Sequence, residues 1–504
     1  MSRSVCRVIG FAAIGLLLVS GSVTAEPCPP ILLSSPCALA PEGDACRSEQ
    51  RLHLFGGGTA RPADCAPPHK RFFLATGEVF LINLLPWIYG RYVVDGAIAR
   101  VSPSTWASNL RNLPDFYRIF DQDSFIVNQV SHPGVSGSFY FNAARTNGYS
   151  FWQSVPFVVA GSFLWETFGE TEKVDVCDVT STFLGGVNWG EISYRSSRMV
   201  LDNEATGVSR VLREFGGFVL DPAGALTRLV TGDMWKVGPN SDDRLPSSLV
   251  AVLDAGYRHR GNENPGHPEQ ALLSGVVRYG DPFEGQNRKP FDVFQVSAEF
   301  AGPSSTLVTR FQAFGLVADG ELSSKRKSEH RIGVVLGYDY QNSLNRVYQD
   351  ETLGLRFLSR FALPVKADLR TDVGIAASPL AAVESDYPVQ DRAQPSQWMS
   401  IGNTIGRSYD YAPGGSAEVT ARIRRDEVDL FAVGYVLRLV HTVNGNSNNS
   451  RVQTAFAEGR VPLTRNLSAG AGWTWDERLT TYDALPTVHR SASEWRLFAS
   501  WIMR

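Results

Sequence analysis

The densest group of side chains that could carry out chemistry lies in residues 131–149, SHPGVSGSFYFNAARTNGY. The segments around it are mostly apolar, so this run stands out by its polarity. Its histidine, serines, asparagines and arginine could supply proton transfer, a nucleophile or hydrogen bonds to a ligand. The candidate residues are His132, Ser136, Ser138, Asn142, Arg145 and Asn147.

One hypothesis for this segment is an ester hydrolase. His132 would act as the general base and Ser136 or Ser138 as the nucleophile, which would suit acyl-ester cleavage in a lipid environment. However, neither serine lies in a Gly-x-Ser-x-Gly turn, and a His-Pro pair also fits a turn that leads into a helix. We therefore favour a structural interpretation, in which His132 makes one buried hydrogen bond and Asn142 and Arg145 hold neighbouring helices together.

Charged residues continue downstream of this segment. Glu166 and Glu170 are four residues apart, as are Glu191 and Arg195, so each pair shares one face of a helix. Because burial of an unpaired charge costs roughly several kcal/mol, these residues must pair with one another or face a watery cavity. The predicted polar and ligand-binding network comprises His132, Asn142, Arg145, Asn147, Glu166, Glu170, Glu191, Arg195, Arg213 and Glu214, with Arg210 and Arg228 nearby.

A metal site is a second hypothesis, because carboxylates on facing helices build the metal sites of helical bundles. The chain lacks the Glu-x-x-His repeat of that pattern, and ion pairs with the arginines of the network account for the same residues. The sequence therefore predicts neither a metal nor a cofactor. The ligands weighed for this hypothesis are His132, Glu166, Glu170 and Glu191.

Residues 1–25 predict a secretory signal peptide. Arg3 and Arg7 precede an apolar run over residues 8–20, and Val-Thr-Ala at 23–25 forms a small-residue cleavage site. A membrane-anchoring first helix is the alternative, but the run is short and rich in small residues. The mature protein is therefore expected beyond the inner membrane.

Residues 26–70 form a Cys-, Pro- and Gly-rich loop segment without periodicity. In an oxidising compartment its four cysteines predict two disulfides, and three connectivities are open. A metal site is the alternative, although no Cys-x-x-Cys spacing is present. The fifth cysteine of the mature chain, Cys177, is expected to be a small buried residue. The four loop cysteines are Cys28, Cys37, Cys46 and Cys65.

Residues 71–237 predict a helical domain. Residues 72–94 are mostly apolar, but polar residues and a proline interrupt them, which indicates a buried helix or helix pair rather than a membrane span. Residues 150–170 repeat large or small apolar side chains at a spacing of about 3.6, and Gly161-Ser162 offers a patch where another backbone could approach closely. The interrupting residues of the first segment are Glu78, Asn83, Pro86 and Arg91.

Two further helices are expected over residues 178–197 and 205–218. All these helices are apolar on more than one side. They must therefore pack in a multilayered bundle or lie enclosed by another part of the molecule.

Residues 249–504 change to a period of two, after a polar linker over residues 238–248. Trp495, Leu497 and Trp501, for example, alternate with smaller or polar residues, so that one face is large and apolar and the other is not. A transmembrane barrel shows such a face to lipid and keeps the polar face in its lumen. A soluble β-sandwich or jelly roll is the alternative. Charges within the strands favour the barrel, because they suit a wet lumen: Arg356, Arg360, Arg438 and Arg496.

The length of this second half allows about twelve strands, at roughly 21 residues for a strand and its connection. The sequence therefore predicts an α+β protein, with an N-terminal helical domain followed by an antiparallel transmembrane β-barrel of about twelve strands.

The central helical segment contains a series of short motifs with a recognisable spacing. They are His132-Pro133, Gly137-Ser138, residues 140–145 (YFNAAR), Asn147-Gly148, residues 150–152 (SFW), Gly161-Ser162, Trp165-Glu166, Glu170, Gly185-Gly186, Gly190-Glu191, Leu201-Asp202 and Arg213-Glu214. With these motifs the segment resembles a bacterial family known as domain of unknown function 3943. The resemblance covers about residues 116–232 and implies an exported, outer-membrane-associated protein of helices plus barrel, without supplying a reaction. The chain departs from the family at residues 174–178, Val-Asp-Val-Cys-Asp, where the family has a Pro-Ser…Asn-Asp approach to its third helix.

The composition excludes several classes of protein. The 504 residues are 43% hydrophobic, which excludes a disordered chain. The 48 basic residues nearly balance the 51 acidic ones, so the chain lacks the excess of positive charge that is typical of nucleic-acid-binding proteins. No internal run approaches about 20 uninterrupted apolar residues, which excludes a polytopic helical membrane protein.

We therefore expect a protein of the outer membrane of a Gram-negative bacterium, in contact with outer-membrane lipid. Its helical domain is expected to serve as a plug or periplasmic collar for the barrel. The expected role is to bind a small or lipidic ligand, to gate its passage, or to act as an envelope scaffold, rather than to catalyse a reaction. The alternatives are a lipid or ester hydrolase that uses His132 and a soluble periplasmic ligand-binding protein.

Overall fold

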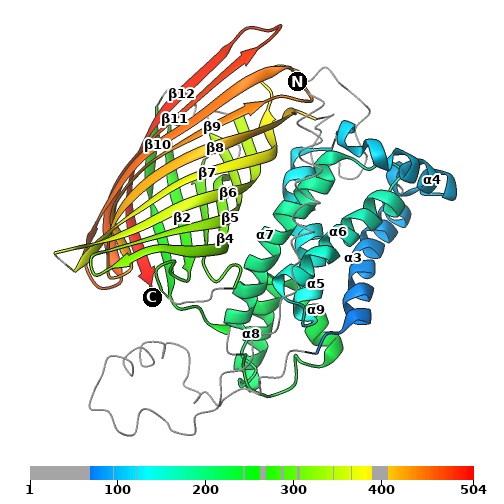
Figure 1. Ribbon diagram of the computed structural model, residues 1–504, viewed down its shortest axis with the longest axis horizontal. Coiled ribbons are helices and arrows are strands. Elements are labelled where there is room, and N and C mark those ends of the chain that lie inside the picture. Colours follow the sequence, from blue (N-terminus) through cyan, green and yellow to red (C-terminus); the bar gives the residue numbers. More distant parts are fainter. Residues whose placement is uncertain are drawn as a thin grey trace.

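The computed structural model describes residues 69–504, except 95, 122, 242–243, 262–267, 285–288, 304–306, 344–345, 365 and 389–406. Figure 1 shows the helices of the first half standing beside a barrel that the second half of the chain forms. The predicted signal peptide and the four loop cysteines lie outside the described residues. Cys177 is described, and it is a free, buried cysteine.

Twelve strands form the barrel. They are β1 (Leu249–Arg260), β2 (Glu269–Tyr279), β3 (Phe294–Gly302), β4 (Val308–Lys325), β5 (Ser328–Ser343), β6 (Arg346–Leu363), β7 (Ala367–Glu384), β8 (Tyr409–Arg425), β9 (Val428–His441), β10 (Asn448–Pro462), β11 (Leu467–Tyr482) and β12 (Val488–Met503).

The barrel is closed, because its first strand pairs with its last. Ala251 of β1 lies opposite Met503 of β12, and every strand pairs antiparallel with its neighbours in the sequence. Closure leaves no strand edge with unpaired backbone groups. The predicted fold class, a helical domain followed by an antiparallel barrel of about twelve strands, is confirmed.

The strands turn apolar side chains outward and polar ones into the lumen. In β6, Leu355 and Phe357 are exposed on the outer wall, whereas Arg356 between them points inward. There Arg356 pairs with Asp372 at 2.6 Å and with Glu418 at 2.8 Å. The arginines that the sequence places within strands are therefore tolerated because the lumen supplies their counter-ions.

The described helical domain precedes the barrel and contains seven α-helices, together with 3₁₀ turns and two π-helical segments. Its elements are α3 (Phe72–Tyr92), η3 (Ala97–Ala99), α4 (Pro103–Asn112), η4 (Leu113–Arg118), η5 (Val127–Gly137), α5 (Ser138–Thr146), α6 (Phe151–Leu164), η6 (Trp165–Gly169), α7 (Val176–Val200), α8 (Gly207–Leu220) and α9 (Pro222–Thr231).

The longest helix, α7, packs on the outer wall of the barrel over strands β4 to β7 (Figure 1). The ring of Trp189 stacks on Phe311 of β4 and meets Tyr338 of β5 edge-on. The hydroxyl of Tyr338 donates to the carbonyl of Gln129 of η5 at 2.7 Å, so this side chain faces the helices, whereas the neighbouring Asp339 pairs with Arg438 across the lumen. A second contact extends the cover to β8, where Cys177 packs with Tyr409 and Tyr411.

Small residues let α7 approach the π-helical segment η5 closely. A Cβ atom added at Gly186 would lie 2.6 Å from the Cα atom of Gly137, and one added at Gly185 would lie 2.2 Å from Pro133. Since real Cβ atoms do not approach so closely, only glycine fits at these positions. The patch noted in the sequence at Gly161 accommodates a side chain instead, because the ring of Tyr140 lies against it.

Helix α3 differs from its sequence interpretation. It is one continuous helix through Pro86, and half of its apolar residues are exposed, including Phe73 and Phe80. Its buried side combines Ala75 and Val79 with two polar residues, Glu78 and Asn83. The two polar side chains bind neighbouring helices. By length and composition α3 could cross a membrane, and it is the one helix among the described residues that could. The interpretation as a buried helix or helix pair was wrong, because α3 is a single helix with one exposed apolar side.

Candidate functional site

The predicted network separates in the structure into two arginine–carboxylate groups, a set of asparagine contacts and an acidic cluster. The first group centres on Glu191 of α7, which is fully buried. Arg145 donates to both of its carboxylate oxygens, at 2.7 and 2.9 Å, and Arg195 donates at 2.8 Å. Arg195 also meets Asp292 of the β2–β3 connection at 2.8 Å, so two arginines face two carboxylates. Two-pronged arginine pairs of this kind fix the geometry of the groups that they join.

A second group centres on Glu214 of α8. Arg210, one turn earlier, pairs with it at 2.9 Å, and Arg228 of α9 pairs with it at 2.6 Å. Arg213 points elsewhere, since it donates to the carbonyl of Val200 at 3.2 Å. This group joins α8 to α9.

The two asparagines of the predicted site tie α5 to other helices. Asn142 donates to Ser193 of α7 at 2.7 Å and to Asp221 before α9 at 3.0 Å. Asn147 donates to Glu78 of α3 at 2.9 Å. These contacts give both asparagines a role in helix packing.

His132 lies in η5 and is directed toward α7. Its Nδ1 atom is 3.3 Å from the hydroxyl of Thr182, and its Nε2 atom is 3.5 Å from a carboxylate oxygen of Asp178. Burial lowers the pKa of His132 to about 4, so the ring is neutral at pH 7. The hydroxyl of Ser138 donates to the carbonyl of Gly134 at 2.6 Å. The ring nitrogens therefore face Thr182 and Asp178 rather than a serine.

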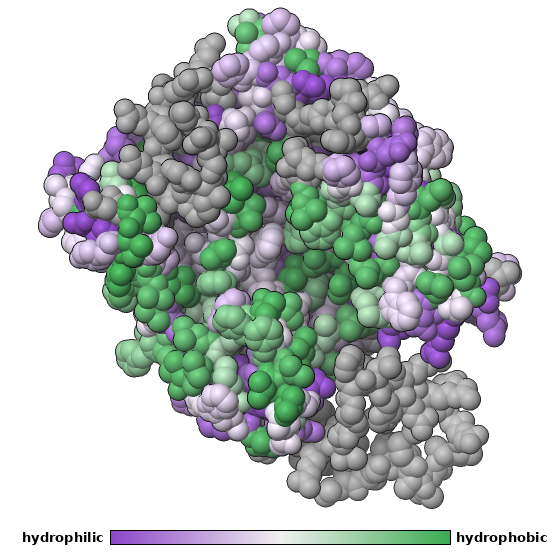
Figure 2. Space-filling model, turned by 180° about the vertical axis from the view of Figure 1, so that it is seen from behind, coloured by the Kyte–Doolittle hydropathy of each residue, from purple (hydrophilic) through white to green (hydrophobic). Residues whose placement is uncertain are grey.

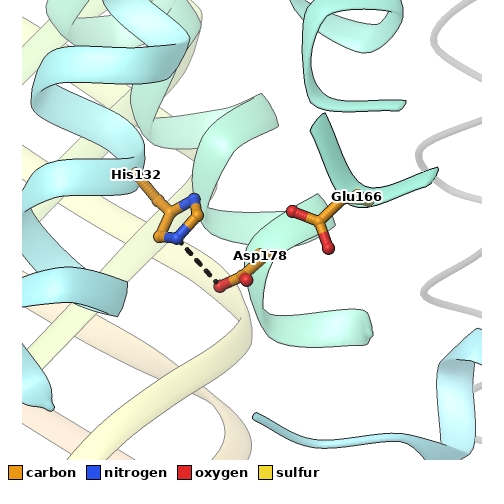
Figure 3. A group of neighbouring side chains, drawn as sticks. All are labelled: His132, Glu166 and Asp178. Atoms are coloured by element: carbon orange, nitrogen blue, oxygen red, sulfur yellow. Dashed lines mark ion pairs between the residues drawn. The ribbon is translucent and has the colours of Figure 1, made fainter. Parts of the chain in front are cut away.

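Glu166 completes a three-residue group with His132 and Asp178. One potential ligand atom from each residue lies within 4.8 Å of the other two. Figure 3 shows the three side chains converging from η5, η6 and α7, with the carboxylate of Glu166 turned toward the other two. A nitrogen and two carboxylates in this arrangement could hold a metal ion. We call these three residues the His–Glu–Asp group.

More carboxylates surround the His–Glu–Asp group, and they shift one another's ionisation. Burial, Asp121, Glu172 and Asp175 raise the pKa of Asp123 to about 8. Burial and the charge of Asp121 raise the pKa of Glu172 and that of Asp175 to about 7 each. Burial and neighbouring carboxylates also hold the pKa of Glu166 well above its usual range. In the two arginine–carboxylate groups opposite charges attract, whereas in this cluster the carboxylates repel one another when they are ionised.

Neighbouring residues fix the backbone around the group. The Asp175 side chain caps α7 by accepting from the backbone N–H groups of Cys177 and Asp178, at 2.6 and 3.1 Å. The buried Asn109 side chain donates to the carbonyls of Glu166 and Glu170, at 3.2 Å each. The positions of Glu166 and Asp178 are thus set by capping hydrogen bonds and not by packing alone.

Sequence reasoning singled out His132 and Glu166 but missed Asp178 and Thr182. Asp178 lies in the stretch where the chain departs from the related family, so it drew attention only as a difference. The available signal was its place three residues after Asp175, since an aspartate at a helix start followed by a second acid three residues later marks a capped first turn. Glu191, weighed as a ligand, binds arginines instead.

The barrel lumen is a second candidate site. It holds a cavity of about 150 Å³. Arg438 forms an ion pair with Asp339 at its wall, and Gln312 donates to Asp339 at 3.1 Å. The charged lining residues are balanced in sign: Arg310, Arg356, Arg422 and Arg438 with Asp339, Asp350, Asp372 and Glu418.

Residues 118–223 match the domain of unknown function DUF3943, as the sequence resemblance predicted. This segment contains the whole His–Glu–Asp group. No curated protein matches the chain.

Solved structures similar to this chain include three porins. They are the NanC porin in a rhombohedral crystal form (12% identity, 49% of this chain and 98% of that chain, TM-score 0.22), the KdgM porin in complex with disordered oligogalacturonate (8%, 50% and 99%, TM-score 0.21) and an anion-selective porin from Comamonas acidovorans (7%, 51% and 99%, TM-score 0.22). The closed barrel is established by this chain's own strand pairing.

Proposed function

We propose that the protein is an outer-membrane barrel that passes small polar solutes through a narrow lumen, braced on one side by its helical domain. The observation that carries the proposal is the charged cavity inside a closed barrel whose outer wall is apolar. A barrel of this kind satisfies every backbone group internally, which a chain that spans a membrane requires.

The surface of the molecule supports a membrane location. Figure 2 views the molecule from the side opposite to that of Figure 1. Hydrophobic side chains spread over the middle of the face in view, and hydrophilic ones gather toward its edges. On the barrel the exposed apolar residues include Ile375, Leu439 and Leu497. On the helical domain they lie on α3 and on α8, where Val211 and Phe215 are examples. Apolar patches of this extent fit a lipid surface better than water.

The strand connections support an orientation. At the barrel end where β1 begins and β12 ends, the connections β4–β5 and β8–β9 contain two residues each, 326–327 and 426–427. At the opposite end the β7–β8 connection spans residues 385–408. Outer-membrane barrels carry short turns on the periplasmic side and longer loops outside. We therefore place the C-terminus in the periplasm.

The lumen limits what could pass. A water molecule needs roughly 10–15 Å³ of such a cavity, so 150 Å³ holds on the order of ten waters. The equal numbers of arginines and carboxylates in the lining give little overall preference for one sign of charge. Small neutral or zwitterionic solutes and simple ions fit these two properties.

Conductance in planar lipid bilayers tests this proposal. The wild-type protein should give small, weakly selective channels. The double variant D339A/R438A removes an ion pair at the cavity wall while keeping the charge balance, so its channels should conduct more. The matched control, I332A/L439A, changes lipid-facing residues of the same two strands and should leave conductance unchanged. Absence of channels in both wild type and D339A/R438A would show that the lumen is a sealed core.

A further inference from the structure

We infer that His132, Glu166 and Asp178 bind a divalent transition-metal ion within the helical domain, on the outer side of the barrel wall. This inference is independent of the proposed passage through the lumen. It rests on the geometry of the three side chains, on unsatisfied buried oxygens and on the way the neighbouring residues hold the group.

The spacing of the donor atoms fits a metal ion after small side-chain movements. Ligands about 2.0–2.1 Å from a tetrahedral ion lie about 3.3 Å from one another. The Nε2 atom of His132 and the nearer oxygen of Asp178 are 3.5 Å apart. All three donor atoms lie within 4.8 Å of one another. A modest rotation of the Glu166 side chain would therefore bring its carboxylate oxygen to the distance from the other two donors that an ion requires.

Two carboxylate oxygens of the group are buried without a hydrogen-bond partner. They are Oε2 of Glu166 and Oδ1 of Asp178, and the two residues are only 1% and 4% exposed. The other side of the Glu166 carboxylate is engaged, because Glu170 is hydrogen-bonded to it. A buried oxygen without a partner loses its hydrogen bonds to water and gains nothing in return, so native proteins rarely leave one.

The two carboxylates of the His–Glu–Asp group also lack a basic side chain that would balance their charge, among the described residues. In the described part of the chain, no arginine or lysine forms an ion pair with Glu166 or Asp178, whereas Glu191 and Glu214 each have two arginines. A divalent cation would neutralise the two carboxylates and give both unpartnered oxygens a ligand role.

The surroundings of His132 resemble those of a histidine that binds a metal, whose other ring nitrogen meets a hydrogen-bond partner. Thr182 engages Nδ1. A hydroxyl that accepts the Nδ1 proton leaves the Nε2 lone pair free for the ion, and such a contact also fixes the ring orientation. Both His132 and Glu166 lie in π-helical segments, which are rare and occur frequently at functional sites.

The donor set selects the class of ion. Imidazole nitrogen suits Zn²⁺ and its first-row neighbours, and carboxylates are also ligands for Zn²⁺ and Mn²⁺. Mg²⁺ prefers an all-oxygen octahedron and should bind more weakly. Three protein ligands leave a fourth tetrahedral position for water or another ligand.

Metal binding by the full-length protein in detergent, after EDTA treatment and dialysis, tests the inference. The probes are Zn²⁺, Mn²⁺ and Mg²⁺, measured by isothermal titration and by metal analysis of the dialysed protein. We expect one Zn²⁺ per chain, weaker Mn²⁺ binding and little Mg²⁺ binding. Since each carboxylate supplies a ligand, E166Q and D178N should each lower Zn²⁺ affinity at least about tenfold.

The control variant is E284Q, in a second acidic group formed with Asp281 and Glu427 at the barrel end where β1 begins. E284Q should bind Zn²⁺ at the His–Glu–Asp group with the same stoichiometry and affinity as the wild type. Folding is checked separately by the thermal midpoint of the metal-free proteins. D178N should keep a thermal midpoint close to that of metal-free wild type, because asparagine matches aspartate in size and no arginine or lysine among the described residues loses a partner.

Three results would overturn the inference. They are no Zn²⁺ binding by the wild type, unchanged binding in folded D178N and E166Q, or loss of the bound ion in E284Q. In the first case, the carboxylates share protons among themselves instead of binding an ion. None of these results bears on bilayer conductance, so the two proposals fail separately.

Discussion

The indole ring of Trp189 stacks on Phe311 with the ring centroids 4.9 Å apart and an interplanar angle of 24°. This contact joins α7 to β4, and it places the helical domain on the outer wall of the barrel and not in its lumen. The preceding residue of the helix, Asn188, adds a hydrogen bond of 3.1 Å to the carbonyl of Ala313.

Trp189→Ala should weaken the attachment of the helical domain. Loss of a large aromatic contact costs up to about 3–5 kcal/mol, and Trp189 is only partly buried, so a value near the lower end is expected. Limited proteolysis should cleave the helices faster while the barrel keeps its heat-modifiable migration in electrophoresis. Trp235→Ala, at a residue 69% exposed, should change neither property.

Gly186→Ala should separate η5 from α7. The added methyl group would lie 2.6 Å from the Cα atom of Gly137, and backbone cannot yield as a flexible side chain can. Overpacking of this kind costs typically about 1–3 kcal/mol. The matched control is Gly77→Ala in α3, where nothing lies within 4 Å, and which should be neutral or slightly stabilising. Equal thermal midpoints for both variants would contradict the close approach.

Glu191→Gln should destabilise the helical domain strongly, because it leaves Arg145 and Arg195 buried without their shared carboxylate. Breaking a buried ion pair by removing one partner costs about 3–5 kcal/mol. The measurement is the thermal midpoint of helical ellipticity. Glu204→Gln, at an exposed position between α7 and α8, serves as the control and should change it little.

The metal-free helical domain should lose stability as the pH rises from 5 to 9. Burial and the carboxylates of Asp121, Glu172 and Asp175 raise the pKa of Asp123 to about 8. A carboxyl group whose pKa is higher in the folded state stabilises that state while it is protonated, and this contribution disappears as the pH rises through the folded pKa. Thermal midpoints across this range in EDTA should therefore fall, and Asp123→Asn should flatten the profile. A rising or flat wild-type profile would contradict the electrostatics described here.

The barrel could be predicted from the sequence because its signal is local. Each strand alternates apolar and polar residues, and Leu355 and Arg356 show this at neighbouring positions. The faces follow from the period of two without knowledge of any distant contact. The helical segments were predicted by the same kind of local argument.

The environment of α3 could not be predicted in this way, because its apolar and polar sides are both compatible with a buried helix. Its Glu78 side chain accepts hydrogen bonds from Asn147 and Thr227, residues distant in the sequence. Only these partners show which side of α3 is buried and which is exposed.

The His–Glu–Asp group was half predicted. His132 and Glu166 were recognised by residue type, but Asp178 joins them through the packing of η5 and η6 against the start of α7. Two of the three residues lie in π-helical segments, where the regular spacing of 3.6 residues per turn does not apply. Sequence spacing therefore could not have placed these side chains on a common point.

The docking of α7 on β4 to β8 also determines the order in which the molecule can assemble. The helical domain leaves the ribosome before any strand, and its wall-facing residues, such as Trp189, have no partner until those strands have been synthesised and paired. Completion of the helical domain must therefore wait for the barrel. New chains pass through a stage in which apolar helices are already made and their covering surface is not.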